Sequence, residues 1–215
     1  MRKRVILIDA SKVLIKQMDD LFAEVLPNVE VLHLVDEGII PLMKEPSKLM
    51  ARRLSNLVIS AEQSGVDIIL ITAACAIPFM DLLKSLIDVP LMIITQPMID
   101  VAVEKANTVG VVAMEKPVAE SIVALIEKAA HQKSKKISIK VTLCEEAFTA
   151  FVSGDNVKYE KLISEVIMET AKSTDVVTLA HVSMAGIAPK IQDRVNRPIL
   201  TVPRIAVEKI KAMLT

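Results

Sequence analysis

The chain has 215 residues, of which 52% are hydrophobic and 24% charged, and this balance excludes a disordered or collagen-like protein. Basic and acidic residues number 26 each, so no net charge would draw the chain to nucleic acid or to an anionic membrane. Aromatic residues make up only 2%, which removes the stacking platforms that single-stranded nucleic acids use. We therefore expect small molecules, rather than nucleic acid or membrane, as partners.

The hydropathy pattern indicates where in the cell the protein is expected and whether it forms oligomers. The longest uncharged stretch, residues 68–80, falls well short of the roughly 20 residues that span a bilayer, and no signal-peptide pattern is visible. These features favour a soluble, cytoplasmic protein. The 11 methionines and the mean hydropathy of +0.47 also favour a homo-oligomer, a dimer or higher, that buries an apolar face; the alternative is that the methionines fill the core of each chain.

Eight short runs rich in β-branched residues alternate with helical patterns along the chain. They cover residues 5–8, 29–34, 67–71, 91–94, 110–112, 137–143, 175–179 and 199–202. Nearly continuous apolar strands joined by helices form parallel sheets that are covered on both faces. The pattern therefore predicts an α/β fold.

The two halves of the chain repeat each other at a fixed shift of about 108 residues. The superposed pairs are 29–37 with 137–145, 53–63 with 161–171, Asp67 with Asp175, and Pro90 with Pro198. Because aliphatic runs match easily by chance, the matched acidic and proline positions carry the case for duplication; convergent strand composition is the alternative. We predict two pseudo-symmetric lobes, residues 1–97 plus 203–215 and residues 98–202, each a parallel sheet flanked by helices.

Open parallel sheets bind ligands at the carboxyl ends of their strands, so we expect a ligand crevice between the two lobes. Its walls would come from two turns that the repeat makes equivalent, residues 72–76 and residues 180–184. In this register Ala73 corresponds to His181, and Cys75 corresponds to Ser183.

Three residues near these turns are candidate catalytic groups: Cys75, His181 and Asp9. If Cys75 lies at a helix start, the helix dipole should lower its thiol pKa from about 8.5 toward neutrality. His181 could serve as acid or base near pH 7, and Asp9, directly after the first strand, could orient such a group. The alternatives are that Cys75 and His181 pack structurally and that Asp9 caps the next helix.

Small and polar residues around these groups are candidate substrate-binding positions, since backbone N–H groups at a helix start, hydroxyls and amides bind carboxylates. They are Ser11, Thr72, Ala73, Ala74, Gln96, Val182 and Ser183. Helix capping is the alternative for the polar ones. We interpret His33 as packing within a strand and Cys144 as structural. No glycine-rich phosphate loop, HExxH motif or G-x-S-x-G motif is present, so we expect no cofactor and no metal.

Six segments spread over nearly the whole chain carry a family resemblance. They are residues 5–11 (Val-Ile-Leu-Ile-Asp-Ala-Ser), 34–38, 67–75, 96–98, 143–148 and 175–184. Together they resemble the aspartate/glutamate racemase superfamily, which includes hydantoin racemases, maleate isomerases and arylmalonate decarboxylases. The resemblance implies two α/β lobes, no cofactor, and two cysteines that shuttle a proton at the carbon next to a carboxylate.

The chain departs from this family at the catalytic positions. Carried over by register, the two family cysteines fall on Ala73 and His181, so both thiols are missing. Asp9 matches the aspartate of the first turn in glutamate racemases. Cys75 falls where related enzymes often have a Thr or Ser that binds the substrate carboxylate.

The sequence therefore predicts a divergent member, a cofactor-independent racemase, isomerase or decarboxylase acting at the α-carbon of a small carboxylate. The substrate could be an amino acid, a hydantoin or a dicarboxylate-like compound. Either His181 replaces the second cysteine in a one-sided protonation, or Cys75 pairs with His181 as an acid–base couple. A carboxylate-binding member without activity and an interaction protein are the alternatives.

Overall fold

The computed structural model describes residues 2–43 and 46–214. The chain divides into two compact units, a first lobe (Met1–Ile94 with Ala206–Thr215) and a second lobe (Thr95–Ile205). Within the described residues, no helix combines the length and the apolar character needed to cross a membrane.

In its described residues, the first lobe has four strands and the helices between them. Its elements are β1 (Arg4–Asp9), α1 (Ile15–Val25), β2 (Glu30–Val35), α2 (Lys48–Gln63), β3 (Ile68–Ile71), α3 (Met80–Lys84) and β4 (Leu91–Ile93), with 3-10 helices η1 (Lys12–Leu14), η2 (Glu37–Leu42) and η3 (Ala74–Phe79). The strands form one parallel sheet in the order β2-β1-β3-β4.

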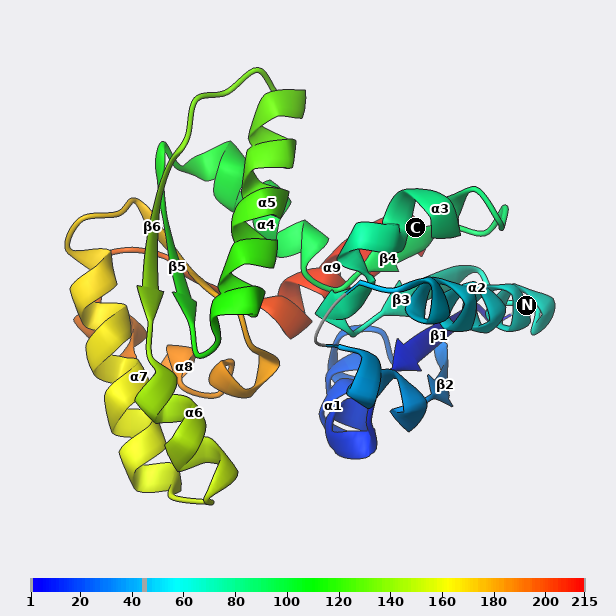
Figure 1. Ribbon diagram of the computed structural model, residues 1–215, viewed down its shortest axis with the longest axis horizontal. Coiled ribbons are helices and arrows are strands. Elements are labelled where there is room, and N and C mark those ends of the chain that lie inside the picture. Colours follow the sequence, from blue (N-terminus) through cyan, green and yellow to red (C-terminus); the bar gives the residue numbers. More distant parts are fainter. Residues whose placement is uncertain (1, 44–45, 215) are drawn as a thin grey trace. The chain divides into compact units, whose positions relative to one another are not determined.

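The second lobe has the same strand order. Its elements are α4 (Gln96–Lys105), β5 (Thr108–Ala113), α5 (Lys116–Gln132), β6 (Ser138–Leu143), α6 (Glu145–Val152), α7 (Asn156–Ala171), β7 (Val176–Leu179), η4 (Val182–Met184), α8 (Ala188–Ile191), η5 (Gln192–Arg194) and β8 (Ile199–Thr201); α9 (Val202–Leu214) contains the boundary between the lobes. Its parallel sheet runs β6-β5-β7-β8, and Figure 1 shows β5 and β6 between α5 and α7.

These sheets confirm the predicted α/β fold, all eight strands and the internal repeat. Strands β2 and β6 begin at Glu30 and Ser138, and β3 and β7 begin at Ile68 and Val176, as the predicted shift requires. Strands β1 and β5 match only with a gap, because α5 has 17 residues where α1 has 11.

The matched aspartates of the repeat make equivalent hydrogen bonds in both lobes. Asp67 accepts a hydrogen bond from the backbone N–H of Arg4 at 2.8 Å, and Asp175 accepts one from the backbone N–H of Thr108 at 2.9 Å. Each carboxylate thereby ties the start of one strand to the start of its neighbour. The side-chain bond from Lys3 lowers the pKa of Asp67, and the backbone bond from Thr108 lowers that of Asp175.

Each lobe has its own apolar core, in which a long helix and shorter helices pack against the sheet. In the first lobe, Leu54 and Val58 of α2 pack against the buried Ile69 of β3, and in the second, Ile163 and Ile167 of α7 are buried in the same way. Both helices begin with a side-chain cap at the same register position. The Ser47 hydroxyl accepts the N–H of Met50, and the Asp155 carboxylate accepts that of Lys158.

Candidate functional site

Two of the predicted site residues meet at the carboxyl edge of the first sheet. Asp9 is the last residue of β1 and is 1% exposed, and Thr72 directly follows β3. The Thr72 hydroxyl donates to Asp9 Oδ1 at 2.6 Å and also lies 3.2 Å from the carbonyl oxygen of Ile8. The hydroxyl proton of Thr72 is therefore held by Asp9, and Asp9 does not serve as a helix cap.

His33 joins this pair, so its interpretation as packing is wrong. Its Nδ1 lies 2.7 Å from Asp9 Oδ2, and its Nε2 lies 3.0 Å from Asp19 Oδ1 on α1. The hydrogen bond to Asp9 raises the pKa of His33 above its ordinary value, against the opposing effect of burial. Strand register could have revealed the contact, because His33 pairs with Leu7, two residues before Asp9 on the same face of β1.

The turn after β3 differs from the expected helix start. Ala73 is the N-cap of η3, a six-residue 3-10 helix, and Cys75 is its second residue and half-buried. Burial raises the pKa of the Cys75 thiol to about 11, so the expected lowering is wrong. Desolvation disfavours the thiolate, and here it outweighs the single backbone hydrogen bond that favours it. The thiol is protonated at neutral pH.

The equivalent turn of the second lobe carries His181. This residue is the N-cap of η4, just as Ala73 is the N-cap of η3. Its Nε2 accepts a hydrogen bond from the backbone N–H of Met114 at 3.1 Å, which places the proton of the neutral ring on Nδ1. Burial lowers the pKa of His181 to about 4, so the imidazole is neutral at pH 7.

The other predicted positions differ in whether their polar side chains already form hydrogen bonds within the protein. Ser183 lies 3.1 Å from the Tyr159 hydroxyl, which donates to it. The Gln96 side chain donates to Asp100 Oδ1 within α4 at 2.8 Å. Ser11 is the N-cap of η1 and makes no capping bond with its side chain. Ala74 begins η3 and Val182 begins η4, so both belong to the two equivalent turns.

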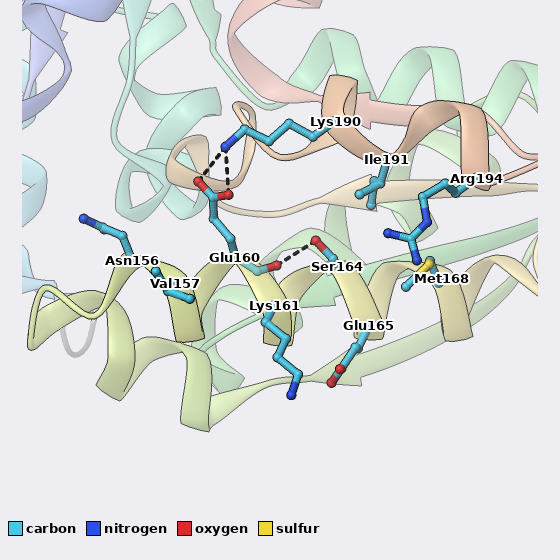
Figure 2. Close-up of a pocket in the computed structure, with 10 residues that line it drawn as sticks. All are labelled: Asn156, Val157, Glu160, Lys161, Ser164, Glu165, Met168, Lys190, Ile191 and Arg194. Carbon is cyan, nitrogen blue, oxygen red and sulfur yellow. Dashed lines mark hydrogen bonds and ion pairs between the residues drawn. The ribbon is translucent and has the colours of Figure 1, made fainter.

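Two grooves in the structure lie away from these residues. A groove of about 600 Å³ follows α7 in the second lobe. Figure 2 shows Lys190 extending toward Glu160, and the Lys190 Nζ atom lies 2.6 and 2.7 Å from the two carboxylate oxygens of Glu160. A second groove of about 330 Å³ runs between α1 and β2, and Asp19 lines it. Within residues 2–43 and 46–214, no cluster of three or more His, Cys, Asp or Glu could hold a metal ion.

Thr95 was not singled out by the sequence. It is 3% exposed and precedes α4, and its hydroxyl is the one buried side-chain nitrogen or oxygen in the described part of the chain without a hydrogen-bond partner. A buried hydroxyl without a partner destabilises the fold, because it has lost its bonds to water.

Replacing Thr95 with the isosteric valine is therefore expected to raise the free energy of unfolding by about 1 kcal/mol. Urea unfolding of the two proteins would measure the change. Thr170→Val is the control, because Thr170 is also buried but its hydroxyl donates to the carbonyl of Val166, and its loss should destabilise. A less stable Thr95→Val protein would contradict the prediction.

The model of the Asp/Glu/hydantoin racemase family matches residues 5–210. The chain belongs to this family. The match confirms the resemblance drawn from the six segments, and it covers both lobes with their two equivalent turns. No curated protein matches the sequence.

Solved structures of this family have the same fold. An aspartate racemase homologue from Pyrococcus horikoshii superposes with a TM-score of 0.77 at 16% identity, covering 99% of each chain. The aspartate racemase of Picrophilus torridus gives 0.74 at 14% identity, over 98% of this chain and 94% of that one. An allantoin racemase from Klebsiella pneumoniae gives 0.72 at 15% identity, over 99% and 87%. At these identities the likeness establishes the two-lobe fold.

Proposed function

We propose that this protein binds a small carboxylate and transfers a proton at its α-carbon without a cofactor. The observation that carries the proposal is the placement of Cys75, a half-buried thiol in the turn after β3, two residues beyond the position of the family's first cysteine. A half-buried thiol with a pKa of about 11 is a proton donor at neutral pH and a poor base. Family membership supports a carboxylate substrate.

The proposed reaction is one-sided. Symmetric racemisation requires a base on one face of the reacting carbon and an acid on the other, and Ala73 supplies neither. In a one-sided reaction, the bond between the α-carbon and a carboxyl group breaks, carbon dioxide leaves, and the electron pair that remains on the α-carbon takes the proton from Cys75 Sγ. The resulting thiolate is then protonated by water, which its high pKa favours. Decarboxylation therefore fits this scheme better than racemisation does.

His181 has a different role in the proposed reaction. A neutral imidazole with a pKa of about 4 is a weak base at pH 7, but its Nδ1–H can donate a hydrogen bond to a carboxylate oxygen. Negative charge develops on that oxygen when the α-carbon becomes a carbanion, so the bond strengthens in the transition state. That the turns after β3 and β7 act on one substrate is part of the proposal.

A second candidate function is carboxylate binding without turnover. It is favoured by the alanine at position 73, which leaves the turn after β3 without a thiol at the position of the family's first cysteine. In this case the two turns would keep their ligand-binding role after the loss of the family's thiols.

Proton NMR in heavy water with a panel of amino acids, hydantoins, maleate and substituted malonates tests both candidates. We expect proton exchange, isomerisation or carbon dioxide loss with the wild type, and a rate at least about 100-fold lower in Cys75→Ser and in His181→Ala. Cys144→Ser is the matched control, because Cys144 is a buried thiol at the start of α6. Full activity in Cys75→Ser would overturn the assignment of the donor. No reaction across the panel, together with saturable thermal stabilisation by a carboxylate, would establish the binding protein instead.

A further inference from the structure

A chain of four polar groups runs through the first lobe from its surface to the turn after β3. Asp19 on α1 contacts His33 at 3.0 Å, His33 contacts Asp9 at 2.7 Å, and Asp9 accepts the Thr72 hydroxyl at 2.6 Å. The side chains become more buried along this path, from 51% exposed at Asp19 to 14% at His33 and 1% at Asp9. The path therefore connects solvent to the turn that carries Cys75.

The second lobe builds the same edge without this chain. Ala113 ends β5 as Asp9 ends β1, and the repeat places Val141 at the position of His33 and Ala180 at that of Thr72. All three replacements are apolar.

The backbone bonds at the two edges are nevertheless equivalent. Asp36 N–H donates to the Asp9 carbonyl at 2.9 Å, and Cys144 N–H donates to that of Ala113 at 2.9 Å. Thr72 N–H donates to the Ile8 carbonyl at 3.1 Å, and Ala180 N–H to that of Val112 at 3.0 Å. The fold therefore does not require the chain of polar groups. Because this chain is present in the first lobe and absent from the second, we connect it with the candidate functional site.

The charge of the His33 imidazole decides whether all hydrogen bonds of the polar chain can form. The charged groups that act on His33 are Asp9 from β1 and Asp19 from α1, and both favour the protonated ring. Protonated, the ring has two N–H groups and donates one to each carboxylate. Neutral, it has one N–H and one lone pair, so one of the two carboxylates must face the lone pair and loses its bond.

We propose that His33 is a positioning residue of the candidate site: its protonated ring holds Asp9, Asp9 holds the Thr72 hydroxyl, and loss of the ring proton alters the turn at residues 72–75. The role in the site rests on the proposed function, since that turn is where we place the substrate. The coupling between the His33 ring and the turn at residues 72–75 does not depend on the proposed function.

The sign of the pH dependence follows from the raised pKa of His33. Because the folded protein binds this proton more tightly than the unfolded chain, the stabilisation is fully present below about pH 6.5, the ordinary value. It is lost as the pH rises through the raised pKa of the folded state. The arrangement of the turn is expected to change over the same range.

NMR of the ligand-free protein tests the coupling directly. We expect the His33 imidazole to titrate with a midpoint above about pH 6.5, and the amide resonances of Thr72–Cys75 to move with the same midpoint. Asp19→Asn should lower that midpoint by roughly 0.2 to 0.7 of a pH unit, as for a half-exposed ion pair. Asp20→Asn is the matched control, because Asp20 pairs with Lys16 on the same helix and does not contact His33. In His33→Gln the pH-dependent movement of the turn amides should vanish.

Three results would overturn the proposal: a His33 midpoint at or below about pH 6.5, turn amides that do not follow it, or equal midpoints in Asp19→Asn and Asp20→Asn. The outcome for the proposed function is read separately, from the substrate panel. Coupled titration with no turnover and no carboxylate binding would uphold the coupling and reject the proposed function.

Discussion

Asp9→Ala is expected to lower the free energy of unfolding of the first lobe by about 3 to 5 kcal/mol at pH 6. The substitution leaves the His33 ring and the Thr72 hydroxyl without their shared partner at a position that is 1% exposed. His33 keeps Asp19 and the Thr72 hydroxyl keeps the Ile8 carbonyl oxygen at 3.2 Å, but neither replaces the buried carboxylate, so much of the desolvation penalty remains. Urea unfolding followed by circular dichroism would measure the loss.

Two further variants separate the contributions at this position. Asp9→Asn keeps an acceptor for Thr72 but removes the negative charge beside His33, so its loss of stability should be intermediate. Asp19→Asn removes the outer carboxylate, which is 51% exposed, and should change stability by less than about 1 kcal/mol. If Asp9→Ala also changed stability by less than about 1 kcal/mol, the polar chain would contribute little to the folded state.

A second large effect is expected at Gly110 on β5, where α7 approaches the strand. A Cβ atom at this position would lie 2.5 Å from Thr170 Cγ2 and 3.1 Å from Thr174 Oγ1. Neither threonine can move easily, because the Thr170 hydroxyl donates to the Val166 carbonyl and the Thr174 hydroxyl donates to the Thr170 carbonyl. Gly110→Ala should therefore lower the free energy of unfolding by about 1 to 3 kcal/mol through overpacking.

Gly186→Ala is the matched control for this prediction. Gly186 has no atom within 4 Å of an added Cβ and does not have a positive φ, so the change there should stay within about 0.5 kcal/mol. Unfolding of both variants in urea gives the comparison. Equal stability of the two would show that α7 shifts away from β5 without penalty.

Local patterns in the sequence were sufficient for the strands and the repeat. Strand formation depends on short runs of β-branched residues, and the predicted runs at 67–71 and 175–179 contain β3 and β7. Asp67 and Asp175 marked the duplication because each carboxylate binds a backbone N–H at the start of a neighbouring strand. A residue that makes the same hydrogen bond in both halves is found as an identity when the two halves are aligned.

The candidate site was predictable only as a set of positions. Parallel strands end at one edge of a sheet, so the sequence alone placed Asp9 and Thr72 near each other. Whether the Thr72 hydroxyl was free could not be read from the sequence, because the answer depends on a bond between residues that are far apart along the chain. The same holds for His33, whose partners come from β1 and α1.

The sequence by itself determined the α/β class, the eight strands, the repeat and the family, because these depend on local residue patterns and on matched positions. The tertiary structure decided the pKa shifts of the candidate groups. Burial raises the pKa of Cys75 and lowers that of His181, whereas the bond to Asp9 raises that of His33. Desolvation and contacts between distant segments exist only in the folded chain, and they set which of these groups can give or hold a proton.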